Sequence, residues 1–396
     1  MIKLKKTLYA VLCLLTGICI LSGCIEEYEA DIAEEDSNLL VVEGTIRSGV
    51  NKFYLSYTQA LNATYTPKTI SSAMVSVRGS DGSEIVAHNS YYTDGYFTCQ
   101  IDTLYPDVAY YLHIETGNEV YESEPQKPLP TEKIAEVMGS QVTPESKIEV
   151  LVTPATPSNP DQAHYYAWTY VETWEVHPDF VTGIYYDTTE RRPVEKPNQF
   201  PLRGWKDATG PMITVGASSS YSGHHIQKLK LYDFNRDSER IFYKYSGLVE
   251  QRAISKAEYE YELARRQAAS EMGGLFTPQP SALPTNIRCL TSSKHVIGYV
   301  GCSLNTSRYR FFLHPKDFSI IHRSPDDSRL WIDNPTWVDC CRLVERGMYL
   351  CEWDEPMMPG EALHTAWAFA YQLDVRYKGA YIEEPEFWSL NENVSY

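Results

Sequence analysis

Histidine and cysteine are the residue types in this chain best suited to metal binding, and both occur in close groups. His224 and His225 are adjacent, so on a strand their side chains would point to opposite sides. Two adjacent histidines can therefore bind the same metal ion only if they lie in a loop and not in a strand. Cys340, Cys341 and Cys351 lack the Cys-x-x-Cys spacing and have no histidine close by, which disfavours zinc. We expect no metal and no cofactor.

Three motifs that mark well-known enzyme classes are missing from the sequence. It contains no Gly-x-Ser-x-Gly elbow, no His-Glu-x-x-His and no glycine-rich phosphate loop. Asp and Glu together number 52, so no two of them can be singled out as a glycosidase pair. We therefore expect a protein that is not an enzyme, with a hydrolase as the least favoured alternative.

One cysteine stands in a context that predicts covalent lipid attachment. Three lysines among residues 1–7 precede an apolar run at 8–21, and Ser22-Gly23-Cys24 follows directly. The run is shorter than the roughly 20 residues of a membrane-spanning helix and is typical of a signal peptide. The small residues before Cys24 resemble the bacterial lipobox, in which the cysteine receives acyl chains such as palmitate. Residues 1–23 are thus predicted to be a lipoprotein signal peptide and Cys24 the membrane anchor, with an ordinary signal peptide or a transmembrane anchor as the alternative.

An acidic segment follows the predicted anchor. Residues 24–37 carry seven carboxylates, a composition typical of a solvated tether. Loss of residues 1–23 removes three lysines and no acidic residue, which lowers the net charge from −17 to −20. Nucleic-acid phosphates are bound through lysine and arginine, so we expect no binding to nucleic acid.

Residues 38–126 show the pattern of an all-β, mainly antiparallel sandwich of the immunoglobulin-like or transthyretin-like kind. Tyr110 opens one of the expected strands after a loop, and its hydroxyl is expected to bind upstream backbone as in a tyrosine corner. Turn signals such as Asp-Gly separate seven segments rich in β-branched and aromatic residues, at 39–46, 52–60, 73–79, 84–90, 96–101, 109–115 and 119–125.

A proline-rich linker at 124–133 leads to a second domain, 134–396, which is expected to be β-sandwich-like with one helix and long loops. The helix is predicted at 256–272, because Ser255 and Glu258 have the spacing of a capping box. Residues 178–225 are predicted to be long loops, where ligand or partner contacts are expected. Aromatic side chains favour such contacts, although several of them would equally fill the gap between the two domains. The candidate contact residues are Tyr185, Tyr186, Trp205, Tyr221, His224 and His225.

The remaining cysteines leave two alternatives open. In an oxidising compartment disulfides are expected, and otherwise these residues are free buried thiols. Cys289 and Cys302 flank a predicted hairpin that suits one bridge. Cys340 or Cys341 could reach Cys351 for a second.

The order of several motifs resembles one protein family. The lipobox and the acidic tether are followed by LLVVEGTI, SSAMVSVRGSDG, TDGYF and YYLHIETGNEVYESEP, and later by AHYYAWTYVE, LFTPQPSALPTNI and VIGYVGCSL. Together they resemble the lipoproteins of Bacteroidetes that carry the domain of unknown function DUF4249, from Cys24 to about Cys340. VDCCR and EPEFW resemble closing elements of that family, but the long stretch between them leaves the cysteine pairing open.

The resemblance implies no established activity and no catalytic residues. Family members look like partners of TonB-dependent receptors. It therefore implies an outer-membrane lipoprotein that acts as an accessory or captures a small ligand for its receptor. The acidic tract after Cys24 resembles the tract that marks surface-exported lipoproteins, which predicts exposure on the cell exterior, and a spacer that faces the periplasm is the alternative. An adhesin or structural surface module without a transporter is the alternative.

Overall fold

The computed structural model describes seven ranges of the chain, and strands predominate in them. Most strand pairs are antiparallel, so the predicted all-β fold is confirmed. The predicted signal peptide 1–23, Cys24 and the tether 24–37 lie outside the described residues. In the part that is described, no helix has the length and apolar character needed to cross a membrane. The described ranges are 39–58, 68–89, 94–159, 161–271, 283–322, 327–390 and 392–396.

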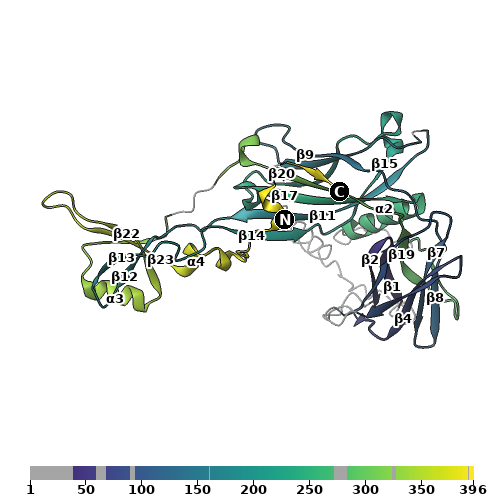
Figure 1. Ribbon diagram of the computed structural model, residues 1–396, viewed down its shortest axis with the longest axis horizontal. Coiled ribbons are helices and arrows are strands. Elements are labelled where there is room, and N and C mark those ends of the chain that lie inside the picture. Colours follow the sequence, from purple (N-terminus) through teal and green to yellow (C-terminus); the bar gives the residue numbers. More distant parts are fainter. Residues whose placement is uncertain are drawn as a thin grey trace, which may run out of the picture.

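The first body of the molecule, here called the N-terminal sandwich, contains all seven strands predicted from its sequence (Figure 1). Its strands pair in the order β18-β8-β7-β4-β5-β6-β2-β1-β19, with β3 beside β2. Phe53 and Leu55 of β2 point to the same face, as alternation requires, and are fully buried with Leu112 of β7. The strands are β1 (Leu40–Ile46), β2 (Gly49–Tyr57), β3 (Lys68–Thr69), β4 (Ala73–Gly79), β5 (Glu84–Asn89), β6 (Tyr96–Ile101), β7 (Tyr110–Thr116), β8 (Glu119–Ser123), β18 (Ile287–Cys289) and β19 (Val296–Cys302).

Two strands of the N-terminal sandwich come from far along the chain. β19 lies parallel to β1, with Leu40 opposite Val296 and Ile46 opposite Cys302, and β18 pairs with β8. Parallel neighbours need a long crossover connection. The chain therefore leaves this sheet after β8, builds part of another domain and returns. The predicted range 38–126 omits the two strands that complete the sheet.

The tyrosine corner expected in this sandwich is present. Tyr110 opens β7 and is 5% exposed. Its hydroxyl accepts a hydrogen bond from the backbone N–H of Tyr105 at 3.0 Å. The contact fastens the loop before β7 to the edge of the sandwich.

The second body, the middle sandwich, consists of two antiparallel sheets. One has the order β16-β10-β9, and the other β14-β11-β17-β20-β24 with β15 also beside β11. Val150 from the first sheet meets Trp168 and Phe311 from the second in one fully buried core. The strands are β9 (Ile134–Ser140), β10 (Ile148–Pro154), β11 (Tyr165–Val176), β14 (Gly204–Thr209), β15 (Thr214–Ala217), β16 (Leu229–Phe234), β17 (Tyr245–Ile254), β20 (Ser307–Leu313) and β24 (Val394–Ser395).

The third body, the distal lobe, lies at the end of the molecule away from the N-terminal sandwich (Figure 1). Its sheet, β21-β23-β22, packs on α3, and the hairpin of β12 and β13 completes it. Trp367, Leu350 and Cys340 form its core, so the predicted domain 134–396 contains more than one core. The elements are β12 (Ile184–Asp187), β13 (Arg192–Glu195), β21 (Leu330–Asp333), α3 (Trp337–Glu345), β22 (Met348–Asp354), β23 (His364–Phe369) and α4 (Ala370–Leu373).

The segment 178–225 is not the run of long loops that the sequence predicted. It contains four strands, of which β12 and β13 belong to the distal lobe, whereas β14 and β15 pair with β11. Each is only four to six residues long. Such short strands between prolines and glycines leave too little alternation to be recognised in sequence.

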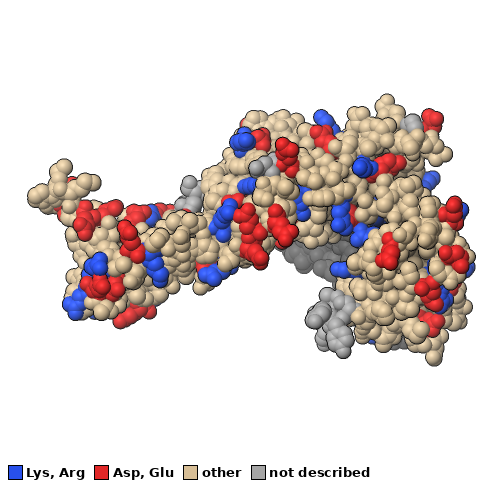
Figure 2. Space-filling model, viewed as in Figure 1, with Lys and Arg blue, Asp and Glu red and all other residues tan. Residues whose placement is uncertain are grey.

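The helix predicted at 256–272 is confirmed as α2 (Lys256–Glu271). α3 was not predicted, although Thr336 and Asp339 form its capping box. Figure 2 shows acidic side chains on all three bodies, in keeping with the net charge. Short 3₁₀ segments are η2 (Ser218–Ser220), η3 (Ser222–His224), η4 (Glu239–Ile241), η5 (Pro315–Asp317), η6 (Val375–Lys378) and η7 (Glu386–Ser389).

Candidate functional site

The N-terminal and middle sandwiches are joined by a hydrogen-bonded junction. The N–H of Thr131 donates to Asn305 Oδ1 at 3.0 Å, and its hydroxyl donates to the Asn305 carbonyl at 2.7 Å. The Ala253 N–H donates to Thr131 Oγ1 at 2.9 Å, and the Ser303 hydroxyl donates to the Ala253 carbonyl at 2.7 Å. The end of the proline-rich segment 124–133 is thereby fixed between β17 of the middle sandwich and the segment that follows β19 of the N-terminal sandwich.

Helix α2 lies at this junction (Figure 1). Ser255 caps it as predicted, because Ser255 Oγ accepts a hydrogen bond from the Glu258 N–H at 3.1 Å. The Glu258 carboxylate turns instead to Arg252, whose Nη1 lies 2.5 Å from Glu258 Oε1 in an ion pair. Gly301 of β19 makes room for this carboxylate, since a Cβ there would lie 2.5 Å from Glu258 Oε1.

The two members of this ion pair differ in their contact with solvent. Glu258 is 3% exposed, whereas the Arg252 side chain is 12% exposed and lines the cleft described next. Burial raises the pKa of Glu258 and outweighs the opposing effect of the Arg252 charge. The carboxylate is therefore the member that carries most of the desolvation cost.

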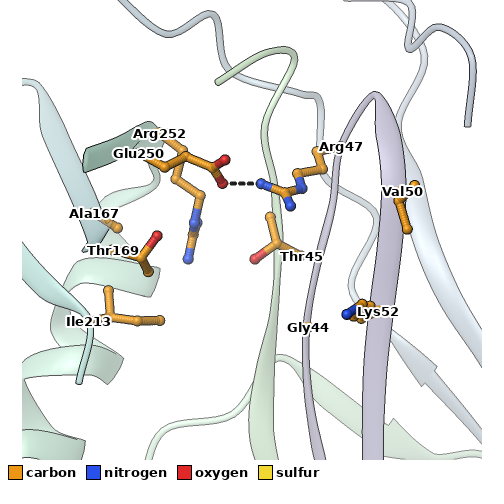
Figure 3. Close-up of a pocket in the computed structure, with 10 residues that line it drawn as sticks. All are labelled: Gly44, Thr45, Arg47, Val50, Lys52, Ala167, Thr169, Ile213, Glu250 and Arg252. Atoms are coloured by element: carbon orange, nitrogen blue, oxygen red, sulfur yellow. Dashed lines mark hydrogen bonds and ion pairs between the residues drawn. The ribbon is translucent and has the colours of Figure 1, made fainter. Parts of the chain in front are cut away.

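A cleft of about 400 Å³ lies where the two sandwiches face each other (Figure 3). Its volume falls within the range of small-molecule binding sites. One wall comes from β1, β2 and the turn between them, and the other from β11, β17 and the segment before β15. The lining residues are Gly44, Thr45, Arg47, Val50, Lys52, Ala167, Thr169, Ile213, Glu250 and Arg252.

Positive charge gathers in this cleft of an otherwise acidic chain. Arg47, Lys52 and Arg252 line it together with one carboxylate, Glu250. That carboxylate is engaged twice, because Arg47 Nη1 pairs with one oxygen and Arg308 Nε lies 2.8 Å from the other. Figure 3 shows the Arg252 guanidinium pointing into the space between the walls. The arrangement attracts negatively charged groups.

A second hollow of about 240 Å³ continues the cleft along α2. Lys52 lines both hollows. The second one adds two tyrosine pairs, in which the ring centroids of Tyr54 and Tyr96 are 4.9 Å apart and those of Tyr261 and Tyr299 are 5.5 Å apart. These rings offer apolar contact area with a polar edge.

The turn between β22 and β23 forms a separate exposed feature, here called the methionine tip (residues 355–363). Met357 is 94% exposed, more than any other large apolar side chain among the described residues, and Met358 is 67% exposed. Both backbone N–H groups donate to Glu361 Oε2, at 2.9 and 3.0 Å. Gly360 has a φ of +97°, which only glycine adopts readily. The tip is thus a preformed turn that presents two methionines to solvent.

Tyr185, Tyr186 and Trp205, predicted as contact residues, do not share a surface. Tyr186 is buried in the core of the distal lobe, and Tyr185 beside it is half-buried. Trp205 is 2% exposed in β14, where its backbone exchanges hydrogen bonds of 2.8 and 2.9 Å with Tyr381. Trp205 is therefore a core residue. Tyr185 and Tyr186 still line a small hollow of about 220 Å³ in the distal lobe, together with Lys196.

Tyr221, His224 and His225 lie at a third place, on the 3₁₀ turns after β15. Tyr221 packs against the core of the middle sandwich. His225 Nε2 lies 3.0 Å from the Pro154 carbonyl oxygen, and His224 has a left-handed backbone with φ 52°. None of the six predicted contact residues lines the cleft.

The cleft could not be recognised in the sequence because the residues of its two walls come from regions that are far apart in the chain. Arg47 and Lys52 belong to the N-terminal sandwich and Arg252 to β17, and no local spacing connects them. The methionine tip did carry a signal. Met357 and Met358 stand between prolines in the stretch 347–375, which contains no lysine or arginine.

The cysteines of the described residues are free thiols, so the predicted disulfide bridges are not formed and the alternative of free thiols applies. Burial raises the pKa of Cys302 to about 12. At Cys289 partial burial acts in the same direction, but the hydroxyls of Ser292 and Thr291 outweigh it and lower the pKa. No group of three or more His, Cys, Asp or Glu side chains suited to a metal occurs among the residues described. The free cysteines are Cys99, Cys289, Cys302, Cys340, Cys341 and Cys351.

The fold and the cleft define an all-β protein of two sandwiches and an outer lobe, with a charged cleft at the junction. The chain belongs to the family of the domain of unknown function DUF4249, whose model matches residues 25–309. The matched range includes every residue that lines the cleft and ends within β20. The family assignment made from the sequence is confirmed for residues 25–309.

No curated protein matches the chain. Among solved structures, a DUF4785 family protein from Legionella pneumophila is similar at 13% identity and a TM-score of 0.18, over 53% of this chain and 50% of that chain. The chain thus spans about half the length of that protein. The chicken interferon gamma receptor alpha chain is similar at 10% identity and a TM-score of 0.15, over 55% of this chain and 90% of that chain. At such scores neither structure carries an argument about function.

Proposed function

We propose that this protein is a lipid-anchored, non-catalytic accessory of a TonB-dependent receptor, on the outer face of the outer membrane, and that it captures a small ligand for that receptor. Cys24 and the acidic tether support the location. Residues 24–38 span about 50 Å when extended, and they lead into β1 of the N-terminal sandwich. The distal lobe lies at the opposite end of the molecule (Figure 1). It is the body that lies farthest from the N-terminal sandwich.

The observation that carries the partnership is the methionine tip. Exposed apolar side chains that stand together mark contact sites, and methionine adapts its shape to a partner. Asp354, Glu355 and Glu361 flank the two methionines, and no lysine or arginine occurs from 347 to 375. An apolar pocket with a basic rim on the receptor would complement both properties.

Purification from native outer membranes in mild detergent tests this partnership. We expect a large barrel protein to co-purify with the wild-type chain and to be lost when Met357 and Met358 are both replaced by Asp. Val142→Asp is the matched control, because Val142 is 77% exposed after β9 of the middle sandwich. Recovery of the wild-type protein alone in every detergent would contradict the proposal.

The alternative, an adhesin or structural module without a transporter, makes a different genetic prediction. Disruption of the receptor gene should leave an adhesin stable and functional at the cell surface. An accessory should instead lose its effect on ligand uptake together with the receptor. Unchanged function without any receptor would favour the adhesin.

A further inference from the structure

We propose that the cleft between the two sandwiches binds a small organic carboxylate with an apolar body. The chain carries a net charge of −17, yet three cationic side chains and one carboxylate line this cleft. With Glu258, which pairs with Arg252, included, the cleft keeps an excess of one positive charge, and such a charge inside a hollow favours an anionic ligand. Figure 2 shows that acidic and basic side chains are interspersed over the visible face of all three bodies.

Two guanidinium groups of the cleft are already oriented by their ion pairs. Glu250 holds Arg47, and Glu258 holds Arg252. Each guanidinium has five N–H donors, so donors remain for a ligand after one carboxylate contact. Arginine N–H groups match the two oxygens of a carboxylate in geometry and charge. Lys52 has no ion-pair partner among the described residues and adds a third positive charge.

The remaining lining residues select for a ligand with a hydrocarbon part. Val50, Ala167 and Ile213 contribute apolar surface, and Thr45 and Thr169 contribute hydroxyls (Figure 3). A bare phosphate would use the cations and leave the apolar surface without contact. A carboxylate on an apolar body uses both. The volume of about 400 Å³ accommodates such a small molecule.

The two walls of the cleft are held in one arrangement before any ligand arrives. Thr131 is bonded to Asn305 beyond β19 and to Ala253 of β17, and Ser303 is bonded to Ala253 as well. These contacts lie between the bodies that carry the two walls. A preformed site loses little conformational entropy on binding, which suits capture of a small ligand.

This inference deepens the ligand-capture part of the proposed function and rests on it, but its test needs no receptor. Saturation-transfer NMR on the purified full chain measures binding of N-acetyl-leucine, of its neutral match N-acetyl-leucinamide, and of inorganic phosphate in competition. We expect the acid to bind at least about tenfold more tightly than the amide, because only the acid meets the cations. Phosphate should compete more weakly than the acid. Failure of the membrane partnership would leave this result unchanged, so the two failures are distinguishable.

Lys52→Glu is the informative variant, because Lys52 is exposed and its replacement leaves both arginine ion pairs intact. We expect it to weaken binding of the acid by about tenfold at low salt and to leave the amide unaffected. Lys316→Glu makes the same charge change at an exposed position outside the cleft and should have no effect. Equal affinity for acid and amide, unchanged binding in Lys52→Glu, or no binding of the acid at about 10 mM would each overturn the proposal.

Discussion

Replacement of Arg252 by methionine is expected to destabilise the protein far more than replacement of its partner Glu258 by glutamine. Methionine keeps the apolar stem but removes the guanidinium that lies 2.5 Å from the carboxylate. Glu258 is then a buried charge without a counter-charge. Glu258→Gln leaves Arg252 with an edge on the cleft, where water can solvate it.

The expected magnitudes follow from the burial of the two groups. Removing one partner of a buried ion pair costs about 3 kcal/mol or more when the remaining charge stays desolvated. Glu258 is 3% exposed, so Arg252→Met should show that full loss. Arg252 keeps 12% exposure, and the isosteric Glu258→Gln should cost about 1 kcal/mol. The double variant carries neither charge and should recover most of the loss.

The pH dependence provides a second signature of the same mechanism. Burial raises the pKa of Glu258 above its ordinary 4.5, so the group favours the folded state most below its unfolded pKa. That contribution is lost as the pH rises through the folded pKa. Arg252→Met removes the charge that opposes this shift and should raise the pKa further. Its deficit in stability should therefore be largest at neutral pH and shrink on acidification.

Urea unfolding of the wild type, both single variants and the double variant, at neutral pH and at about pH 5, measures these differences. Circular dichroism follows the loss of the strands. Glu260→Gln is the control, because this carboxylate is 58% exposed on the same helix. The reasoning is refuted if Glu258→Gln costs as much as Arg252→Met, or if the deficit of Arg252→Met does not change with pH.

Three other outcomes are expected elsewhere in the fold. Gly301→Ala should lower the free energy of unfolding in urea by about 2 kcal/mol, because the new Cβ would lie 2.5 Å from a buried carboxylate oxygen. Tyr110→Phe removes the hydroxyl that accepts a loop hydrogen bond and should cost about 1 kcal/mol in the same assay. Iodoacetamide should label Cys289 before Cys302 in peptide mapping. Hydrogen bonds from hydroxyl groups outweigh partial burial and lower the pKa of Cys289, whereas burial raises the pKa of Cys302.

Each of these outcomes has a matched control. Gly183→Ala places its Cβ where nothing lies within 4 Å, and an equal loss there would rule out the steric explanation. Tyr377 is 66% exposed, so Tyr377→Phe should leave the free energy of unfolding unchanged. A loss of stability as large as that of Tyr110→Phe would contradict a stabilising role for the tyrosine corner. If Cys302 were labelled as fast as Cys289, the burial of the Cys302 thiol would not protect it, and the explanation would be wrong.

The N-terminal sandwich could be predicted strand by strand because its signals are local. Alternation along each strand and glycine turns between strands need only a few neighbouring residues, and the corner of Tyr110 is equally local. No local pattern in β18 and β19, the two strands that complete the sheet, indicates which strands they pair with. The pairing of Leu40 with Val296 depends on a crossover through the middle sandwich, and this placement exists only in three dimensions.

The candidate contact residues stay a prediction, and the sequence could not show which of them are buried. Aromatic density marks the cores of small sheets as strongly as it marks contact surfaces, and Tyr186 and Trp205 proved to be core residues. The charged residues that line the cleft, Arg47, Lys52 and Arg252, are ordinary charged positions on strands or turns. Only the return of the chain to the first sheet gives them a common environment.

This dependence on the returning chain makes the cleft sensitive to a residue that does not line it. Gly301 lies in β19, and its lack of a side chain lets the Glu258 carboxylate settle against the strand and hold Arg252. Gly301→Ala should push this carboxylate away and release Arg252 from its orientation. We expect the variant to bind N-acetyl-leucine about threefold or more weakly while its affinity for the neutral amide changes little, in the same NMR titration. Equal weakening for acid and amide would mean that the whole junction had shifted, and it would contradict an orienting role for the ion pair.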